Sequence, residues 1–248
     1  MKQITVACFS PTGGTRSAAQ AVVQYLDGEA KWLDLLDRTQ RQAELGGDEL
    51  LVLALPVYAG RIPAVEGLLD GLRGDGTPCV VVAAYGNRHY DDALAQMKAV
   101  LERQGFWCAG AAAVVTPHVF APTLGQGRPD GEDRAQLEEL ARRVEEKLAA
   151  GRRESAQVPG DPDPAPRKAV PVKKDRDWDI CLGCALCAKV CPTGAMDGAT
   201  LFWRDDVCIS CMSCVAHCPV GALGFNSSAL AQKLTANFSA RRAVEIFV

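Results

Sequence analysis

Two stretches towards the C-terminal end, residues 179–196 and 206–223, read DICLGCALCAKVCPTGAM and DVCISCMSCVAHCPVGAL. Laid over one another, they are identical at eight of 18 positions. Each holds four cysteines separated by two, two and three residues, and a proline directly follows the fourth cysteine. This proline ends the local helix and fixes the direction in which the chain leaves it. Because thiolates are soft ligands, the duplicated pattern predicts a pair of metal-binding loops.

The spacing resembles the cysteine run of bacterial ferredoxins, in which the fourth cysteine ligates the cluster of the other run. The first three cysteines lie on one tight loop that can hold one face of a 4Fe–4S cube, whereas the fourth lies beyond a turn. The resemblance implies two 4Fe–4S clusters. The first cluster takes Cys181, Cys184, Cys187 and Cys218, and the second takes Cys208, Cys211, Cys214 and Cys191.

Two other interpretations of the cysteines are disfavoured. A disulfide framework belongs to secreted chains, and the N-terminal MKQITVACFS is too short and too polar for a secretory signal. Structural zinc sites usually use two CxxC pairs set well apart, not three cysteines within seven residues. Eight of the eleven cysteines lie in the two runs. They indicate a cytoplasmic location and, because oxygen attacks such clusters, an anaerobic host.

The length and composition predict a second domain. The chain has 248 residues, far more than the roughly fifty of a two-cluster ferredoxin unit, and 48% of them are hydrophobic. No apolar run approaches the roughly 18 residues of a membrane span. The net charge of −3 favours neither nucleic acid nor an anionic membrane surface as a partner.

Strand and helix patterns alternate through residues 1–150. Apolar, β-rich runs predict strands over 3–9, 30–36, 49–60, 77–86 and 106–115. Helical spacing predicts helices over 17–26, 64–72, 87–105 and 134–150. This alternation is typical of α/β folds, so we expect a doubly wound sheet of five parallel strands.

The segment SPTGGT, residues 10–15, follows the first strand and has the composition of a phosphate-binding loop. Its serine and threonines offer hydroxyl groups, and its glycines let the backbone approach a ligand closely. The positive end of the next helix faces the same point. No lysine follows the glycines, which excludes the GxxxxGK[ST] nucleotide loop, and GxGxxG is absent. A turn without a ligand is the alternative interpretation.

SPTGGT resembles the phosphate loop of flavodoxins. PVYAGRIP and AAYGNRHY lie at the ends of the third and fourth strands, where flavodoxins place their two flavin-ring loops. With the cysteine runs, the chain resembles the flavodoxin–ferredoxin fusion family, which implies bound FMN. The resemblance places the FMN phosphate at Ser10, Thr12, Gly13, Gly14 and Thr15. It places the flavin ring at Pro56, Val57, Tyr58, Ala59, Gly60 and Arg61, and at Tyr85, Gly86, Asn87 and Tyr90.

The second ring loop departs from flavodoxins. They carry an acidic Gly-Asp segment here, where this chain has neutral Asn87 and cationic Arg88. Without a carboxylate at this position, an anionic reduced flavin is repelled less. The reduction potential of the flavin therefore cannot be carried over from flavodoxins. The rings of Tyr58, Tyr85 and Tyr90 are candidates to stack on the flavin, with ordinary packing as the alternative.

The remaining segments predict a linker and a tail. Residues 151–177 are rich in proline and charge and are expected to form a stiff linker, which either lets the domains move or lies on the surface as a strap. Residues 178–225 are the expected α+β ferredoxin domain. Residues 226–248 are a tail with helical spacing at Leu230, Leu234 and Phe238.

Two functions of different classes fit these features. The first is an electron-transfer flavo-iron–sulfur protein whose clusters meet redox partner proteins. The second is an FMN-dependent reductase of a small molecule, for example a quinone, fed by its own clusters. A reductase needs room for substrate over the ring. The loop 116–131 could build that room, and its His118 is either an acid to a bound substrate or an ordinary loop residue.

Overall fold

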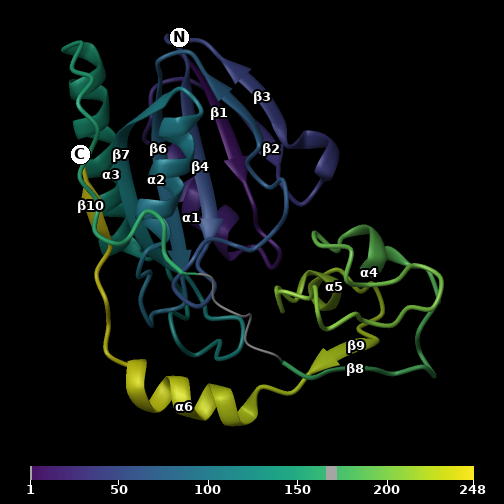
Figure 1. The fold of residues 1–248 in the computed structure, drawn as a ribbon. Coiled ribbons are helices and arrows are strands. Elements are labelled where there is room, and N and C mark those ends of the chain that lie inside the picture. The colour runs from purple at the N-terminus through teal and green to yellow at the C-terminus, as the bar shows by residue number, and fades with distance from the viewer. Residues whose placement is uncertain (1, 166–171) are drawn as a thin grey trace.

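The computed structural model describes residues 2–165 and 172–248 (Figure 1). Its main sheet has the strand order β10-β7-β6-β4-β1-β2. The strands are β1 (Gln3–Cys8), β2 (Glu29–Asp34), β4 (Leu50–Pro56), β6 (Thr77–Tyr85), β7 (Phe106–Val115) and β10 (Glu245–Phe247). All are parallel except β10, which pairs antiparallel with β7. The strand order reverses between β1 and β4, so a ligand site is expected at their carboxyl ends.

Helices cover both faces of this sheet. On one face of the sheet, the apolar sides of α1 (Gly14–Val23) and α3 (Gly131–Ala149) pack against alternate strand residues, such as Val6 and Val52. On the other face, α2 (Ala93–Arg103) packs against the strand residues that lie between these in sequence, such as Leu53. All nine residues of β6 are buried, as a continuous apolar run between two helix layers requires.

The helix predicted over 64–72 is wrong. This segment forms turns and then β5 (Gly71–Gly74), which pairs in parallel with β3 (Gln42–Leu45) in a separate small sheet. Gly67 has φ of +66°, and a Cβ on Gly71 would lie 2.2 Å from the carbonyl oxygen of Arg41. The leucines of the segment still reach the core, so their helix-like spacing reflects burial without a helix.

Other predicted elements differ at their ends. The helix predicted over 87–105 begins only at Ala93, because Asn87 and Asp91 have left-handed backbone conformations. The last helix of this unit begins at Gly131, three residues earlier than predicted, because Asp130 caps it through the backbone N–H groups of Glu132 and Asp133.

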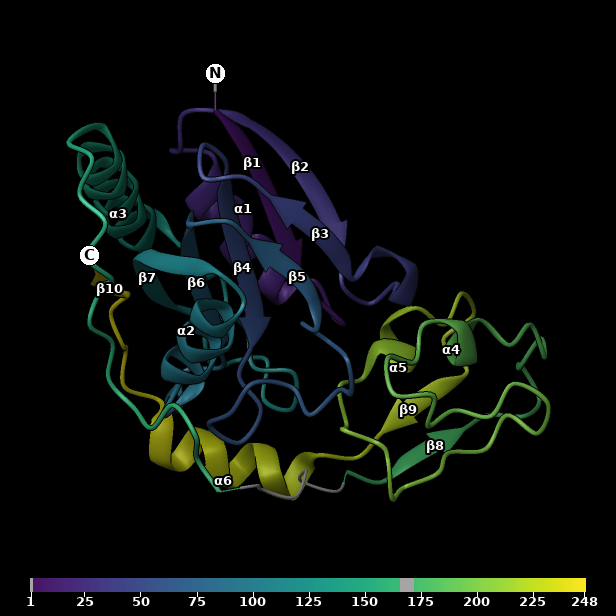
Figure 2. The ribbon, with the colours of Figure 1, turned by 45° about the horizontal axis from the view of Figure 1, so that its top comes forward.

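The cysteine runs fold into a small α+β unit. It contains the antiparallel pair β8 (Lys174–Arg176) and β9 (Leu223–Phe225), and one short helix in each run, α4 (Leu186–Lys189) and α5 (Ser213–Ala216). This unit lies beside the carboxyl ends of the main strands (Figure 1). α6 (Ser228–Phe238) then runs beneath the main sheet, and the chain returns to the sheet edge as β10 (Figure 2). The C-terminal segment therefore packs against the α/β unit and completes the edge of its sheet.

The described part of the predicted linker packs on the surface. The N–H of Ala156 donates to the carbonyl oxygen of Cys108 (2.8 Å), and the N–H of Cys108 donates to the hydroxyl of Ser155 (3.1 Å). Residues 151–165 therefore form a strap, and residues 166–171 lie outside the described residues. The last part of the predicted linker, 172–177, is not a linker, because β8 lies within it and pairs with β9 of the small unit. Within the described ranges, no helix has the length and apolar character needed to cross a membrane. A single 3₁₀ turn, η1 (Arg38–Gln40), completes the elements.

Candidate cofactor sites

The loop at residues 10–15 joins β1 to α1. Gly13 has φ of +92°, a conformation that only glycine adopts readily, and it turns the chain into the first helical turn. The hydroxyl of Ser10 accepts a hydrogen bond from the N–H of Arg16 (3.0 Å). A Cβ on Gly14 would lie 3.2 Å from the hydroxyl of Thr116. No acidic side chain lies in the first turn of α1, so its positive end is open to an anion.

A cavity of about 730 Å³ opens at this loop, at the carboxyl ends of the parallel strands. Its volume lies within the range of small-ligand sites, about 300–1,000 Å³. Pro11, Thr12, Gly14 and Thr15 line it, whereas Ser10 and Gly13 face a second cavity on the other side of the loop. A site with a phosphate cradle at one end and apolar walls fits a phosphate-bearing planar cofactor.

The first predicted ring loop lines this cavity. Pro56, Val57, Tyr58, Ala59 and Arg61 all contribute to its wall. The backbones of Tyr58 and Arg61 exchange two hydrogen bonds, 2.8 and 3.1 Å long, and so close a tight turn. Gly60 forms the turn with φ of +83° and faces away from the cavity.

The guanidinium of Arg61 forms an ion pair with the carboxylate of Asp92. Its charge is therefore already neutralised beside the ring position. Burial raises the pKa of Tyr58 well above its usual value, so its phenol stays protonated. The Tyr58 side chain lies in the wall as a neutral ring.

The second predicted ring loop reaches the cavity only in part. Gly86 and Arg88 line it, but the predicted contacts Tyr85, Asn87 and Tyr90 do not. The two tyrosines are buried in the core, and the hydroxyl of Tyr90 donates to Glu245 (2.7 Å).

The amide of Asn87 instead holds the C-terminal segment. Its Nδ2 donates to the carbonyl oxygens of Phe238 (2.6 Å) and Ala240 (2.9 Å). The left-handed backbone of Asn87 lets its side chain make these contacts. An asparagine next to a strand end carries no signal in the sequence that distinguishes such an anchor from a ring contact.

His118 lines the cavity opposite the first ring loop. Its Nδ1 accepts from the N–H of Phe120 (3.1 Å), so the neutral imidazole carries its proton on Nε2. Burial lowers the pKa of His118, which favours that neutral form. A Cβ on Gly86 would come within 2.4 Å of the imidazole, so a glycine is needed there.

The tail forms a further wall of the cavity. Leu230 and Leu234 of α6 line it and pack on Phe120. The hydroxyl of Ser227, just before α6, donates to the carbonyl oxygen of Phe120 (3.0 Å). The helical spacing of the tail is therefore explained by packing on the loop that carries His118.

The small unit supplies the last wall, which the sequence analysis did not identify. Ile209, Ser210 and Cys211, from the second cysteine run, line the cavity. Ile209 also packs against the core of the main sheet. The second cysteine run therefore lies across the cavity wall from the first ring loop, about 150 residues earlier in the chain. No local sequence signal predicts a contact over this separation.

The cysteines of the second cluster predicted by the resemblance lie together. Cys191, Cys208, Cys211 and Cys214 line one interior space with Met212 and Trp203. Cys191 comes from the first run and the other three from the second, which supports crossed ligation. Among the described residues, no three His, Cys, Asp or Glu side chains converge as ligands of a single metal ion do. A 4Fe–4S cube instead spreads its thiolates over separate irons.

The cysteines of the first cluster have a different environment. Cys181, Cys187 and Cys218 belong to the apolar core of the small unit, whereas Cys184 is exposed. Arg176 of β8 contacts the sulfur of Cys181 (3.1 Å) and that of Cys187 (3.7 Å).

The two runs also differ in the acidity of their thiols. The N–H of Gly183 and the guanidinium of Arg176 lower the pKa of Cys181. Burial raises the pKa of Cys211 to about 12. Cys181 thus forms a thiolate, the form that binds iron, more readily than Cys211.

Comparisons with known proteins agree with this division. Residues 173–219 match the protein family described as 4Fe-4S dicluster domain. A search of curated proteins gave no match. Among solved structures, a flavodiiron core (Flv1) from Synechocystis is 12% identical with a TM-score of 0.43, and the match covers 60% of this chain and 36% of that one.

Two flavodoxins are also similar to the N-terminal part. The Streptococcus pneumoniae flavodoxin is 19% identical with a TM-score of 0.39, covering 59% of this chain and 98% of its own. The Megasphaera elsdenii flavodoxin is 15% identical with a TM-score of 0.39, covering 58% and 98%. The strand order 2-1-3-4-5 of the parallel sheet is that of flavodoxin-like folds. The chain is therefore a fusion of a flavodoxin-like α/β unit with a ferredoxin-type 4Fe–4S dicluster domain.

Proposed function

We propose that this protein transfers electrons between FMN, two 4Fe–4S clusters and redox partner proteins. One observation carries the proposal. Ile209 and Cys211 line both the cavity at the phosphate loop and the interior space between the cysteines of the second cluster. A cofactor in the cavity is therefore separated from a cluster thiolate by no further layer of protein.

The residues present fit FMN. Thr12, Gly14 and Thr15, which line the cavity, and the positive end of α1 would hold the phosphate. The wall at Pro56–Ala59 and the backbone at Gly86 hold the ring. Bound FMN exchanges one or two electrons, whereas each cluster passes one at a time, so the fusion connects two-electron with one-electron chemistry.

The clusters need all eight cysteines of the two runs. Crossed ligation ties the runs together, because each cluster draws three thiolates from one run and one from the other. Cys211, which would bind the second cluster, lines the FMN cavity, whereas Cys184, which would bind the first, is exposed. Electrons entering from a partner would then pass the first cluster, the second cluster and FMN in this order.

Rapid mixing of the anaerobic protein with a one-electron reductant tests the proposal. Flavin reduction that follows cluster reduction should have a rate independent of protein concentration, because a tethered partner keeps its effective concentration on dilution. A rate proportional to concentration would show that the two units work through separate partners. The variant Thr12→Ala/Gly13→Val should lose FMN and keep its iron, which controls for the flavin signal.

The reductase is the second candidate, favoured by His118. Its Nε2–H is a hydrogen-bond donor in the same cavity, and a cavity of about 730 Å³ has room for a small molecule beside a cofactor. Multiple turnover of a quinone by the wild type, lost in His118→Phe without loss of FMN, would favour this candidate. Turnover unaffected by the substitution would remove the role of His118, and turnover absent in both proteins would support the electron carrier.

A further inference from the structure

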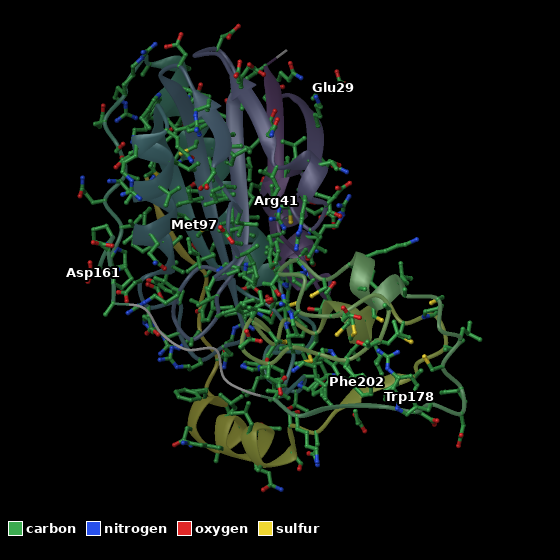
Figure 3. The ribbon with its side chains drawn as sticks, turned by 45° about the vertical axis from the view of Figure 1, so that its right-hand side comes forward. Glu29, Arg41, Met97, Asp161, Trp178 and Phe202 are labelled. Carbon is green, nitrogen blue, oxygen red and sulfur yellow. The ribbon has the colours of Figure 1, made fainter. Side chains whose placement is uncertain are left out.

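Several large apolar side chains of the small unit are exposed, and two of them flank a cysteine of the first run. Among the described residues, the large hydrophobic side chains classed as exposed are Trp178, Ile180, Leu182, Phe202 and Val220. We call these five the apolar face. Ile180 and Leu182 flank Cys181, and the rings of Trp178 and Phe202 lie 5.7 Å apart at the outer end of the unit (Figure 3). None of them lines the FMN cavity.

The apolar face is connected to the cluster through one side chain. The guanidinium of Arg176 lies 5.0 Å from the centre of the Trp178 ring and contacts the sulfur of Cys181 at 3.1 Å. A protein seated on Trp178 would therefore come close to the cluster ligands. The second run offers no equivalent surface, because Ile209 packs against the flavodoxin-like core.

Carboxylates border the apolar face. Asp177 and Asp179 alternate with Trp178 and Ile180 along the chain, and both are exposed. The N–H of Asp197 donates to the carbonyl oxygen of Phe202 (3.0 Å), and a hydrogen bond from the N–H of Thr200 lowers the pKa of the Asp197 carboxyl. A second copy of this chain would bring like charges together on this face. A partner with basic residues around an apolar centre meets both features.

We propose that the apolar face is the docking surface for a one-electron carrier protein whose contact surface is apolar at its centre and rich in lysine or arginine at its rim. The inference rests on the proposed function, because it requires the first cluster. On docking, the reduced cluster gives one electron to the partner, or the oxidised cluster accepts one. The partner thus exchanges electrons at the first cluster while the second faces FMN.

Stopped-flow oxidation of the anaerobically reduced protein tests this inference. The probe is a basic c-type cytochrome, which takes one electron from a cluster as its ferric haem becomes ferrous. Leu182 and Phe202 are 66% and 61% exposed, so Leu182→Asn/Phe202→Asn should leave the fold intact. We expect the second-order rate to fall about tenfold, since central apolar residues dominate such interfaces. Oxidation by a neutral cobalt(III) chelate, which becomes cobalt(II), should not change.

Charge variants provide a matched control. Asp177→Asn/Asp179→Asn should slow the cytochrome reaction at low salt, and the difference from wild type should vanish at high salt. Glu29→Gln/Glu138→Gln removes two exposed carboxylates from the other unit and should have no effect. The same cytochrome with acetylated lysines should react slowly with every variant.

Several outcomes would overturn the inference. They are equal rates for native and acetylated cytochrome, an unchanged rate in Leu182→Asn/Phe202→Asn, or an equal loss with the cobalt chelate. Sedimentation showing a dimer that the apolar-face variant dissociates would instead assign the face to a second copy. A protein that shows no iron–sulfur spectrum before mixing would contradict the proposed function and not the docking surface.

Discussion

The two cysteine runs share the spacing of their cysteines and left-handed backbone positions, yet their surroundings are opposite. Gly183 and its counterpart Ser210 both have left-handed backbones, with φ of +64° and +52°. Leu182, however, is 66% exposed, whereas its counterpart Ile209 packs against the flavodoxin-like core. Docking of the small unit onto the main sheet therefore makes two similar loops unequal. One run faces solvent, and the other forms a wall of the cofactor cavity.

The largest effect is expected when the fourth cysteine of one run or the other is replaced by alanine. With crossed ligation, Cys191→Ala should lose the inner cluster and about half the iron, and with it the fast reduction of flavin. Cys218→Ala should lose the outer cluster instead and keep the inner one. Iron analysis and electron paramagnetic resonance of each variant check this. If Cys191→Ala removed the cluster of the exposed run, ligation would be uncrossed.

A smaller effect is expected from a charge at the paired positions 182 and 209. Ile209→Asp places a carboxylate against an apolar core and should lower the free energy of unfolding by about 2 kcal/mol. It should also weaken FMN binding, because Ile209 lines the cavity. Leu182→Asp should change stability by less than about 0.5 kcal/mol. Anaerobic denaturant titrations of the loaded proteins measure both, and equal losses would contradict the docked arrangement.

The smallest effect concerns the left-handed positions. Gly183→Ser puts a side chain at φ of +64° and should cost about 1 kcal/mol, although no atom lies within 4 Å of the new Cβ. Ser210→Gly should be close to neutral, because relief of the same backbone strain offsets the loss of a buried side chain. Thermal unfolding of the two variants compares them. A larger loss for Ser210→Gly would show that its hydroxyl holds the interface.

Local patterns predicted much of the fold and the positions of the candidate sites. The spacing of the cysteines predicted the dicluster domain, and the apolar runs predicted the five parallel strands. The helix predicted over 64–72 failed, because leucines spaced for burial do not distinguish a helix from turns around Gly67 and Gly71. The edge strand β10 was not predicted, since three residues carry too little periodicity.

The two ring loops show which contacts local sequence patterns do not predict. Tyr58 and Asn87 both lie at the ends of predicted strands, and the sequence offers no reason to treat them differently. The structure places Tyr58 in the cavity wall, whereas the amide of Asn87 binds carbonyl groups about 150 residues further along the chain. A hydrogen bond to a distant backbone leaves no trace in local composition.

The sequence by itself predicted the residues expected to bind iron and phosphate, because such sites depend on residue type and on spacing within a single loop. Only the tertiary structure decided that Ile209 and Cys211 form a wall beside the phosphate loop and that Leu182 faces solvent. The physical reason is that docking depends on the summed packing of whole surfaces. The tail contributes through α6 and β10, whose contacts join segments more than 100 residues apart.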